Sequence, residues 1–418
     1  MNKNDGEKSP HVISPKMRLF MSVDLIGSTA EKQTGGMLPL DAKTERDTES
    51  KFKWQDATYP KWHGPIFNFF SVFEDCMNQA LNRYELFCRS EKFENYLHVS
   101  EQPKIWKRNG DEIIYTVLLQ DAVHVMQSIA LFLSALNAYR GMSGFTEDTG
   151  KNTNENANQP SKKRLNAKAT IWLAGFPIVN SEFALQKSPD RVSERKLIWP
   201  TNANLYDVDA SDGEQSLDYI GPSMDIGFRL TKLADYQRVP ISFEVAYILA
   251  KLGTEFSNNK SSHRPKIEKI NDWRGREKLY ADTNFFHNLF YDGLAHLPGV
   301  FGGQGYPHFW LRSPYQQIDG MQADLINKHA CDLTTATTYC DTTFAEKNHF
   351  LLKPYFANCP LFDKPQPQYN QVLSYWIHLY KKQKGMDDGL EGDRNEFSGD
   401  DRRNDPNKGA DDAGQIEL

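Results

Sequence analysis

Two aspartates stand where apolar, β-rich segments of the sequence are expected to end. Asp24 lies near the end of the run at 17–26, and Asp111 follows an Asn-Gly dipeptide in a second such segment. If the two strands are neighbours in one sheet, both carboxylates point at one spot. Magnesium and manganese prefer hard oxygen ligands, commonly one or two carboxylates with substrate phosphates completing the shell. With the backbone carbonyl of Leu25 as a further oxygen, these residues predict a divalent-cation site.

The segment after Asp24 turns through Gly27 and continues with Ser28 and Thr29. A glycine, which has no side chain, lets backbone N–H groups approach a phosphate closely. Taken alone, the pattern D-x-x-G-S-T also fits a strand that ends in an ordinary turn. It indicates a phosphate-binding turn only in combination with motifs further along the chain.

The elements that must position these residues alternate between strands and helices. Apolar residues recur at helical spacing in two long segments, and Asp121 is the expected N-cap of the second. The order predicts an α+β sandwich of the ferredoxin-like kind, with an antiparallel-rich sheet and its helices on one face. The expected elements are a strand at 17–26, a helix at 65–88, a hairpin at 104–119, a helix at 122–140, strands at 167–178 and 217–221, a helix at 224–236 and a closing strand at 239–248.

Composition excludes several classes of protein. The 418 residues are 39% hydrophobic and 25% charged, which indicates a globular chain and not a collagen-like or mostly disordered one. Five cysteines without a C-x-x-C pair indicate buried thiols in a reducing cytosol. The polar N-terminus lacks the apolar run of a signal peptide, so the sequence predicts a cytoplasmic protein without a membrane segment.

The acidic charge is concentrated at one end of the chain. Residues 387–418 hold 11 acidic and 4 basic side chains, whereas the remainder is close to neutral. Such a segment, almost without aromatic residues, is expected to be disordered. A neutral body argues against nucleic-acid binding through a broad basic patch. The glycines at 299–305 follow no expected strand, so they indicate a turn and not a phosphate loop.

Taken in order, the motifs resemble the class III nucleotidyl cyclase domain. The resemblance covers about residues 17–250, and its most specific part is the D-x-x-G-x-x-x-D-x-G-x-R stretch from Asp218 to Arg229. It implies a class III cyclase-like fold followed by a C-terminal extension. On this reading the chain has a flexible leader (1–16), the cyclase domain (17–250, with a mobile insertion at about 145–163), a region of unknown role (251–385) and a disordered acidic tail (386–418).

The resemblance implies a role for each matching residue. Asp24 and Asp111 match the two metal-binding aspartates of the family. Lys107 and Asp218 match its base-reading lysine and acid, and Arg229 matches the arginine that stabilises the transition state. A homodimer with two shared sites is also implied, because in this fold the metal-binding edge and the arginine-bearing helix face opposite halves of a paired cleft.

One position departs from the common cyclases. Asp225 stands where those enzymes have an asparagine that orients the ribose. With this aspartate, the Ile-Gly-Phe-Arg that follows it and the Gly-Ser-Thr after the first aspartate, the chain resembles the pyrimidine cyclase branch, the PycC-type enzymes of the Pycsar antiphage system. Members of that branch make cyclic UMP or cyclic CMP on phage infection, and the messenger activates a separate effector.

The chemistry of cyclisation suits these residue types. The ribose 3′-hydroxyl attacks the α-phosphorus of its own nucleotide while pyrophosphate leaves, and two divalent cations, Mn²⁺ or Mg²⁺, at that phosphate would assist. Arg229, a forked and permanently charged donor, suits the charge that builds on the phosphate oxygens. Its alternative role is a surface salt bridge on a helix.

Base choice stays open at this stage. A lysine donor beside an aspartate acceptor matches adenine or cytosine and favours CTP over UTP, although the resembled branch contains users of both. Tyr59, Trp62 and Phe70 are candidates for narrowing a base pocket, or they are ordinary core or surface aromatics. The alternatives to a UTP or CTP cyclase are a purine (adenylate) cyclase and a catalytically silent domain that binds a nucleotide.

Overall fold

The computed structural model describes the greater part of the expected elements. Most of the expected leader (1–16), the expected insertion (145–163) and the expected tail (386–418) lie outside the described residues. The described residues are 15–34, 37–39, 58–60, 62–91, 101–142, 165–186, 201–202, 215–257, 288–312, 330–347 and 351–383.

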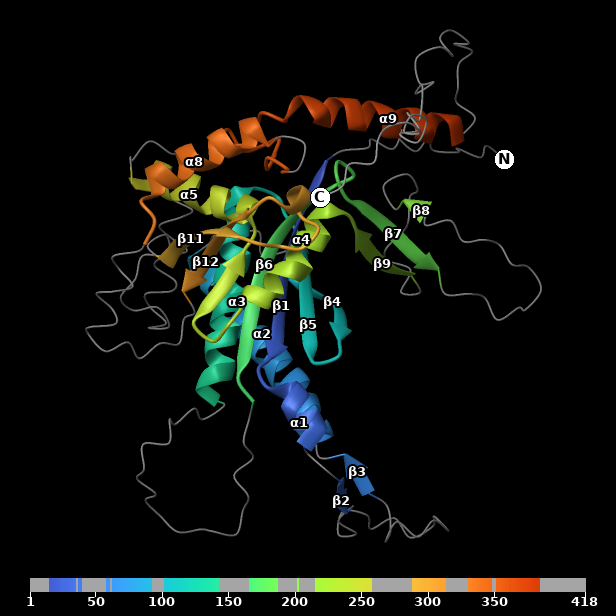
Figure 1. Cartoon of the computed structure of the whole chain (residues 1–418), viewed down its shortest axis with the longest axis vertical. Helices are drawn as coiled ribbons and strands as arrows, with labels where there is room; N and C mark the ends of the chain where they lie inside the picture. Colours follow the sequence, from blue (N-terminus) through green and yellow to red (C-terminus); the bar gives the residue numbers. More distant parts are fainter. Residues whose placement is uncertain are drawn as a thin grey trace, which may run out of the picture. The chain divides into compact units, whose positions relative to one another are not determined.

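A sheet of seven strands forms the centre of the fold (Figure 1). Neighbouring strands pair antiparallel, except that β6 and β10 run parallel. The expected α+β class with a mostly antiparallel sheet is therefore confirmed. In spatial order the strands are β11 (Leu289–Ala295), β12 (Tyr306–Arg312), β10 (Arg238–Ile241), β6 (Ala167–Phe176), β1 (Lys16–Leu25), β5 (Glu112–Leu118) and β4 (Lys104–Asn109).

The strand β1 lies near the middle of this sheet and is covered on both faces. Leu19, Met21 and Val23 are fully buried in the larger core, whereas Phe20 is fully buried in a second core. Successive side chains of a strand point to opposite faces, so both faces must bury apolar surface. The sheet is thus packed between two layers.

Three helices cover the first face: α2 (His63–Glu91), α3 (Ala122–Met142) and α5 (Phe243–Ser257). Asp121 caps α3 as expected, because its Oδ1 accepts a hydrogen bond of 2.9 Å from the backbone N–H of His124. By length and composition α3 could cross a membrane, yet 89% of its apolar window is buried inside the fold, as in a core helix.

The short helix α4 (Pro222–Leu230) lies on the opposite face of the sheet (Figure 1). The expectation of helices on one face holds for α2, α3 and α5 but does not extend to α4. A small sheet of β7 (Ser181–Gln186), β8 (Thr201–Asn202) and β9 (Gln215–Ile220) belongs to the same side. The second core joins both to the large sheet through aromatic rings: Phe20, Trp172, Phe176 and Tyr219.

Gly227 lets α4 approach the sheet closely. A Cβ atom at this position would lie 2.3 Å from Cδ2 of Trp172, which is fully buried in β6. The glycine in D-x-G-x-R is therefore explained by packing, because any side chain would push α4 and the residues on either side of Gly227 away from the sheet.

Gly227→Ala is expected to destabilise the protein by about 1–3 kcal/mol, because the added methyl group overpacks the Trp172 contact. Denaturant unfolding monitored by circular dichroism measures this. Gly64→Ala is the matched control, since Gly64 lies in helix α2 with nothing within 4 Å of its added Cβ. The control should be neutral or slightly stabilising; equal losses in both variants would remove the packing explanation.

The expected strand at 239–248 is wrong beyond its first residues. β10 ends at Ile241, and α5 begins at Phe243. Ser242 separates them: its hydroxyl accepts from the backbone N–H of Val245, and its carbonyl accepts from Ala246. A continuous apolar run does not distinguish a buried strand from a buried helix by periodicity.

The described residues between 251 and 376 belong to the same compact unit as the expected cyclase domain. β11 and β12 extend the large sheet, and helix α8 (Leu333–Glu346) packs on α5 through the ring of Phe344, 5.0 Å from those of Phe243 and Tyr247. The glycines at 299–305 lie in the turn between β11 and β12. The expected boundary at residue 250 falls within α5.

The chain divides into two compact units at a later point, Met1–Trp376 and Ile377–Leu418. Helix α9 (Pro367–Gln383) begins in the first unit, where Trp376 Nε1 donates a 3.1 Å hydrogen bond to the carbonyl of Pro177. In the second unit the structure describes only the end of this helix.

Glu244, the second residue of α5, is a buried acid that makes stability depend on pH. Burial raises its pKa from 4.5 to about 7, against hydrogen bonds from Ser242 and the backbone of Leu352. Since the folded-state pKa lies above the unfolded one, the contribution of Glu244 is fully present below pH 4.5 and is lost as pH rises through 7.

We therefore expect the free energy of unfolding of the wild type, relative to Glu244→Gln, to fall by about 3 kcal/mol between pH 4.5 and pH 7. Chemical denaturation at a series of pH values measures the difference. The control is Glu85→Gln on the exposed face of α2, which should keep the wild-type slope. A wild-type slope in Glu244→Gln would contradict the assignment.

Candidate active site

The ends of β1 and the β4–β5 hairpin meet at one edge of the large sheet. Asp24 pairs in register with Glu112, the first residue of β5, so the preceding residue, Asp111, lies beside it in the hairpin turn. After β1 the chain turns at Gly27 (φ 82°) into the short helix α1 (Ser28–Thr34). The structure thus brings the two aspartates expected from sequence into one place.

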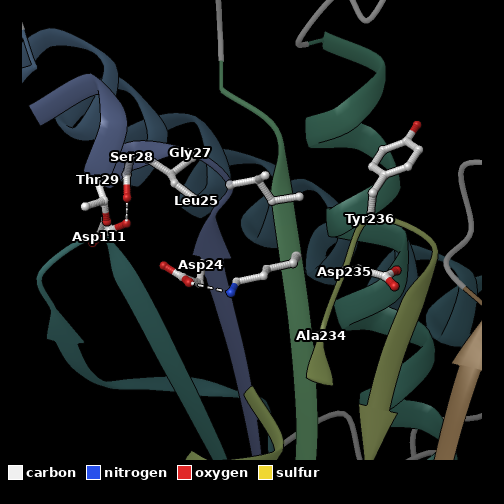
Figure 2. Close-up of a pocket in the computed structure, with 11 residues that line it drawn as sticks. Asp24, Leu25, Gly27, Ser28, Thr29, Asp111, Ala234, Asp235 and Tyr236 are labelled. Carbon is white, nitrogen blue, oxygen red and sulfur yellow. Dashed lines mark hydrogen bonds and ion pairs between the residues drawn. The ribbon is translucent and has the colours of Figure 1, made fainter. Parts of the chain in front are cut away.

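These residues line a cavity of about 480 Å³. Figure 2 shows Asp24 and Asp111 on one side of it and Asp235 and Tyr236 across from them. The lining residues are Asp24, Leu25, Ile26, Gly27, Ser28, Thr29, Asp111, Lys168, Ala234, Asp235 and Tyr236. The cavity therefore contains the predicted Leu25, Gly27, Ser28 and Thr29 together with residues from β6 and from the segment before β10.

Of the two acids, Asp24 is the one whose ionised form is disfavoured by its surroundings. Burial, together with the nearby negative charges of Asp111 and Glu112, raises the pKa of Asp24 to about 6. The ammonium of Lys168, 3.4 Å from Oδ2 of Asp24, acts in the opposite direction. A cation at this position would relieve the same repulsion.

Asp111 has the opposite behaviour. Burial alone raises its pKa, but hydrogen bonds from the Ser28 hydroxyl and from Lys32 outweigh that effect and hold the pKa below its ordinary value. Lys32 Nζ lies 2.9 Å from Oδ1 of Asp111. Asp111 is therefore ionised over a wider pH range than Asp24. Each carboxylate of the pair has its own ammonium partner.

A second cluster joins the hairpin to the small sheet. Lys107 Nζ lies 3.1 Å from Oδ1 of Asp218, so the two residues matched to base recognition contact each other. The same ammonium lies 3.7 Å from the centre of the Trp106 ring, whose Nε1 donates to the carbonyl of Leu217. Cation–π contact and ion pair together fix the direction of Lys107.

A third cluster is carried by α4. Arg229 Nη1 donates a 3.0 Å hydrogen bond to the carbonyl of Asp225 and lies 3.8 Å from its carboxylate. Arg229 Nε donates to the carbonyl of Pro298, at 2.6 Å. The Asp225 side chain is 70% exposed. Arg229 and Asp225 do not line the cavity of Asp24 and Asp111, nor do Lys107 and Asp218.

Two of the three aromatic candidates for a base pocket, Trp62 and Phe70, do not line this cavity. Trp62 precedes α2 and packs against the larger core, and Phe70 within α2 does the same, with its ring 5.6 Å from that of Phe69. Tyr59 lies in β3 (Thr58–Pro60), which pairs with β2 (Met37–Pro39), and its side chain lies outside the description. Trp62 and Phe70 thus pack on the core, as the ordinary core interpretation predicts.

Sequence reasoning missed Lys168, Lys32, Asp235 and Tyr236. Lys168 pairs in register with Asp24 across β1 and β6, a non-local relationship that single-sequence reading does not reveal. A signal for it exists, since Lys168 is the one charged residue of this mostly apolar strand, AKATIWLAGF. Within the described residues, no cluster of three or more His, Cys, Asp or Glu side chains forms a candidate metal site by itself.

Comparisons with known proteins give structural neighbours only. No family model matches the chain, and no curated protein matches it. The adenylyl cyclase CyaB from P. aeruginosa aligns over 73% of this chain and 98% of its own, at 10% identity and a TM-score of 0.31. For the guanylyl cyclase Cya2 the values are 73%, 96%, 10% and 0.34, and for a bacterial light-regulated adenylyl cyclase 75%, 58%, 8% and 0.34. Similarity at this level carries no inference about activity.

Proposed function

We propose that the protein is a nucleotide cyclase that converts UTP or CTP into the 3′,5′-cyclic monophosphate and pyrophosphate. The observation that carries the proposal is the meeting of Asp24 and Asp111 at one cavity, beside the turn of the D-x-x-G-S-T segment. The resemblance of the motif residues Lys107, Asp218 and Arg229 to class III cyclases supports it.

The donors at the cavity fit divalent cations, Mn²⁺ or Mg²⁺, two per site. Asp24 and Asp111 offer hard carboxylate oxygens, and Leu25 lines the same wall. The ammonium groups of Lys168 and Lys32 already contact the two acids, as expected where negative charge is concentrated. Bound cations would lower the pKa of the ribose 3′-hydroxyl and neutralise the triphosphate.

The reaction needs little covalent chemistry from the protein. The 3′-oxygen forms a bond to the α-phosphorus, the bond from that phosphorus to the β-phosphate oxygen breaks, and the hydroxyl proton passes to water. The chain's own task is to orient the nucleotide and to stabilise charge on the α-phosphate. Arg229 suits the second task. Two of its five N–H groups donate to backbone carbonyls, and the other three can donate to phosphate oxygens.

Two copies of the chain would complete one site. Arg229 lies on α4, on one face of the sheet, and does not line the cavity of Asp24 and Asp111. A homodimer in which the arginine of one copy faces the acid pair of the other brings the groups together. We therefore propose a homodimer with two shared sites.

Base recognition is assigned to Lys107 and Asp218. In the structure they form an ion pair of 3.1 Å, so a base would insert between them and replace one charged contact by two hydrogen bonds. A lysine donor and an aspartate acceptor match cytosine, which favours CTP over UTP. Asp225, exposed at the start of α4, is placed at the ribose by the resemblance.

The biological role follows from the same resemblance. We propose that the cyclic pyrimidine nucleotide is a cytoplasmic second messenger in bacterial antiphage defence and that it activates a separate effector protein. Asp225 and the Gly-Ser-Thr segment at 27–29 support this branch.

A purine cyclase is the second candidate. The donor and acceptor of the Lys107–Asp218 pair fit adenine as well as cytosine. The observation that favours the pyrimidine reading over this one is Asp225 in place of an asparagine.

Incubation with ATP, GTP, CTP and UTP in separate reactions, with Mn²⁺ and then Mg²⁺, tests the proposal by mass spectrometry of the products. A single cyclic pyrimidine nucleotide is expected. Cyclic AMP or GMP as the main product would favour the purine candidate. Absence of any cyclic product, with nucleotide binding retained in calorimetry, would favour a silent nucleotide-binding domain.

A further inference from the structure

The turn between β11 and β12 has an unusual backbone. Gly299, Gly302 and Gly303 have φ values of 74°, 62° and 89°, and Phe301 has a φ of 52°. A bulky residue rarely adopts this left-handed region, because its Cβ crowds the backbone. Phe301 is therefore held in a strained conformation that its surroundings must enforce.

Contacts of the Phe301 ring hold the backbone in this conformation. The ring of Phe301 is 5% exposed and lies 5.4 Å from the ring of Tyr306, whose hydroxyl accepts a 2.7 Å hydrogen bond from the backbone of Phe243. The ammonium of Lys347, at the end of α8, lies 5.5 Å over the Phe301 ring and donates to the side chain of Gln304. The turn is thus tied to the start of α5 and to the end of α8.

The strained turn contacts a residue of the proposed active site. The carbonyl of Pro298 accepts the 2.6 Å hydrogen bond from Nε of Arg229. Gly299 is so close that an added Cβ would lie 3.6 Å from Nη2 of the same side chain. The guanidinium therefore donates one hydrogen bond to the turn and another to the carbonyl of Asp225.

We propose that the Pro298–Phe301 turn is a positioning element for the Arg229 guanidinium. This inference rests on the proposed cyclase function. A free arginine side chain samples many rotamers, and fixing two of its N–H groups to backbone carbonyls aims the remaining three at an anionic oxygen. Preorganised donors of this kind act on the rate of the chemical step and much less on substrate binding.

The test compares two glycines of the same hairpin. Gly299 and Gly293 both have positive φ, 74° and 83°, a region that valine rarely adopts. Only Gly299 adjoins the Pro298 carbonyl and the Arg229 side chain. We expect Gly299→Val to lower kcat by about 10- to 100-fold with KM within about twofold, and Gly293→Val to leave both near wild type. Gly299→Asn, which tolerates this backbone region, should recover most of kcat.

A second readout does not depend on catalysis. In protein labelled with ¹⁵N-arginine, the Nε–H resonance of Arg229, assigned by its loss in Arg229→Lys, should exchange slowly with solvent in the wild type and rapidly in Gly299→Val. Equal exchange in both, or equal kcat losses in Gly299→Val and Gly293→Val, would overturn the positioning role. A wild type without cyclase activity would overturn the proposed function alone, because the exchange measurement still shows whether the turn holds the guanidinium.

Discussion

Asp24→Asn is expected to lower kcat for cyclic nucleotide formation by about 1,000-fold or more while the fold is retained. The substitution keeps the shape of the side chain and removes the charge that a divalent cation requires. Ionisation of Asp24 lowers the stability of the folded state, because burial and the neighbouring Asp111 raise the pKa of this carboxyl to about 6. At neutral pH, asparagine should leave the free energy of unfolding unchanged or increased.

This separation of activity from stability makes the result interpretable. A loss of product together with an unchanged or higher melting temperature assigns Asp24 to chemistry. Binding of Mn²⁺, measured by electron paramagnetic resonance in the presence of nucleotide, should weaken in the same variant. Asp111→Asn should also lose activity, but it removes a favourable partner of Ser28 and Lys32 and should lower stability as well.

The chain offers a matched control for Asp24→Asn. Asp235 lines the same cavity, but its Oδ1 accepts hydrogen bonds of 2.7 Å from the backbone N–H groups of Gln237 and Arg238. An asparagine accepts the same bonds, so Asp235→Asn should keep kcat within about threefold. Full activity in Asp24→Asn, or an equal loss in both variants, would contradict a cation site at Asp24.

Arg229→Lys is expected to lower kcat by about 100- to 1,000-fold with little change in KM. Lysine keeps the positive charge but lacks the planar fork, so it loses the contacts to Pro298 and Asp225 and the geometry for phosphate oxygens. Steady-state kinetics with the nucleotide identified by product analysis measures both constants.

Arg89→Lys provides the comparison for this variant. Arg89 is exposed on α2, where its guanidinium contacts Glu85 one helical turn away, far in sequence from every motif. It should have wild-type kinetics. A rise in KM at constant kcat in Arg229→Lys would indicate that the arginine binds the substrate's ground state and does not act in the transition state.

Local signals in the sequence were sufficient for much of the fold. The N-cap at Asp121 and the Asn-Gly turn before Asp111 depend on interactions within a few residues, and both elements form where expected. The strand that carries Asp24 near its end is apolar on both faces, as expected from its composition. The meeting of the two acids also follows, since a hairpin beside β1 has only a few possible registers.

Other features depend on distant parts of the chain. The run at 239–248 is apolar throughout, so tertiary packing and the Ser242 cap decide that its second half is helical. β11 and β12 have aromatic-rich sequences without clear alternation, and they form strands because β10 offers them an edge. Lys168 reaches Asp24 only through the pairing of β6 with β1. The catalytic roles of the site residues and the identity of the base stay predictions.

Lys168 and Lys32, which contact Asp24 and Asp111, reduce the extent to which folding of this edge depends on a bound cation. Two carboxylates side by side repel each other, and a bound cation or a basic side chain relieves this repulsion. Here Lys168 and Lys32 offset part of the negative charge of Asp24 and Asp111 within the chain, so this edge of the sheet depends less on a bound ion. If the pair binds cations as proposed, an ammonium group would move aside for each cation, and the gain in stability would be smaller than at a site without lysines. On the proposed function, cations would therefore enter and leave the acid pair while this edge of the sheet stays folded.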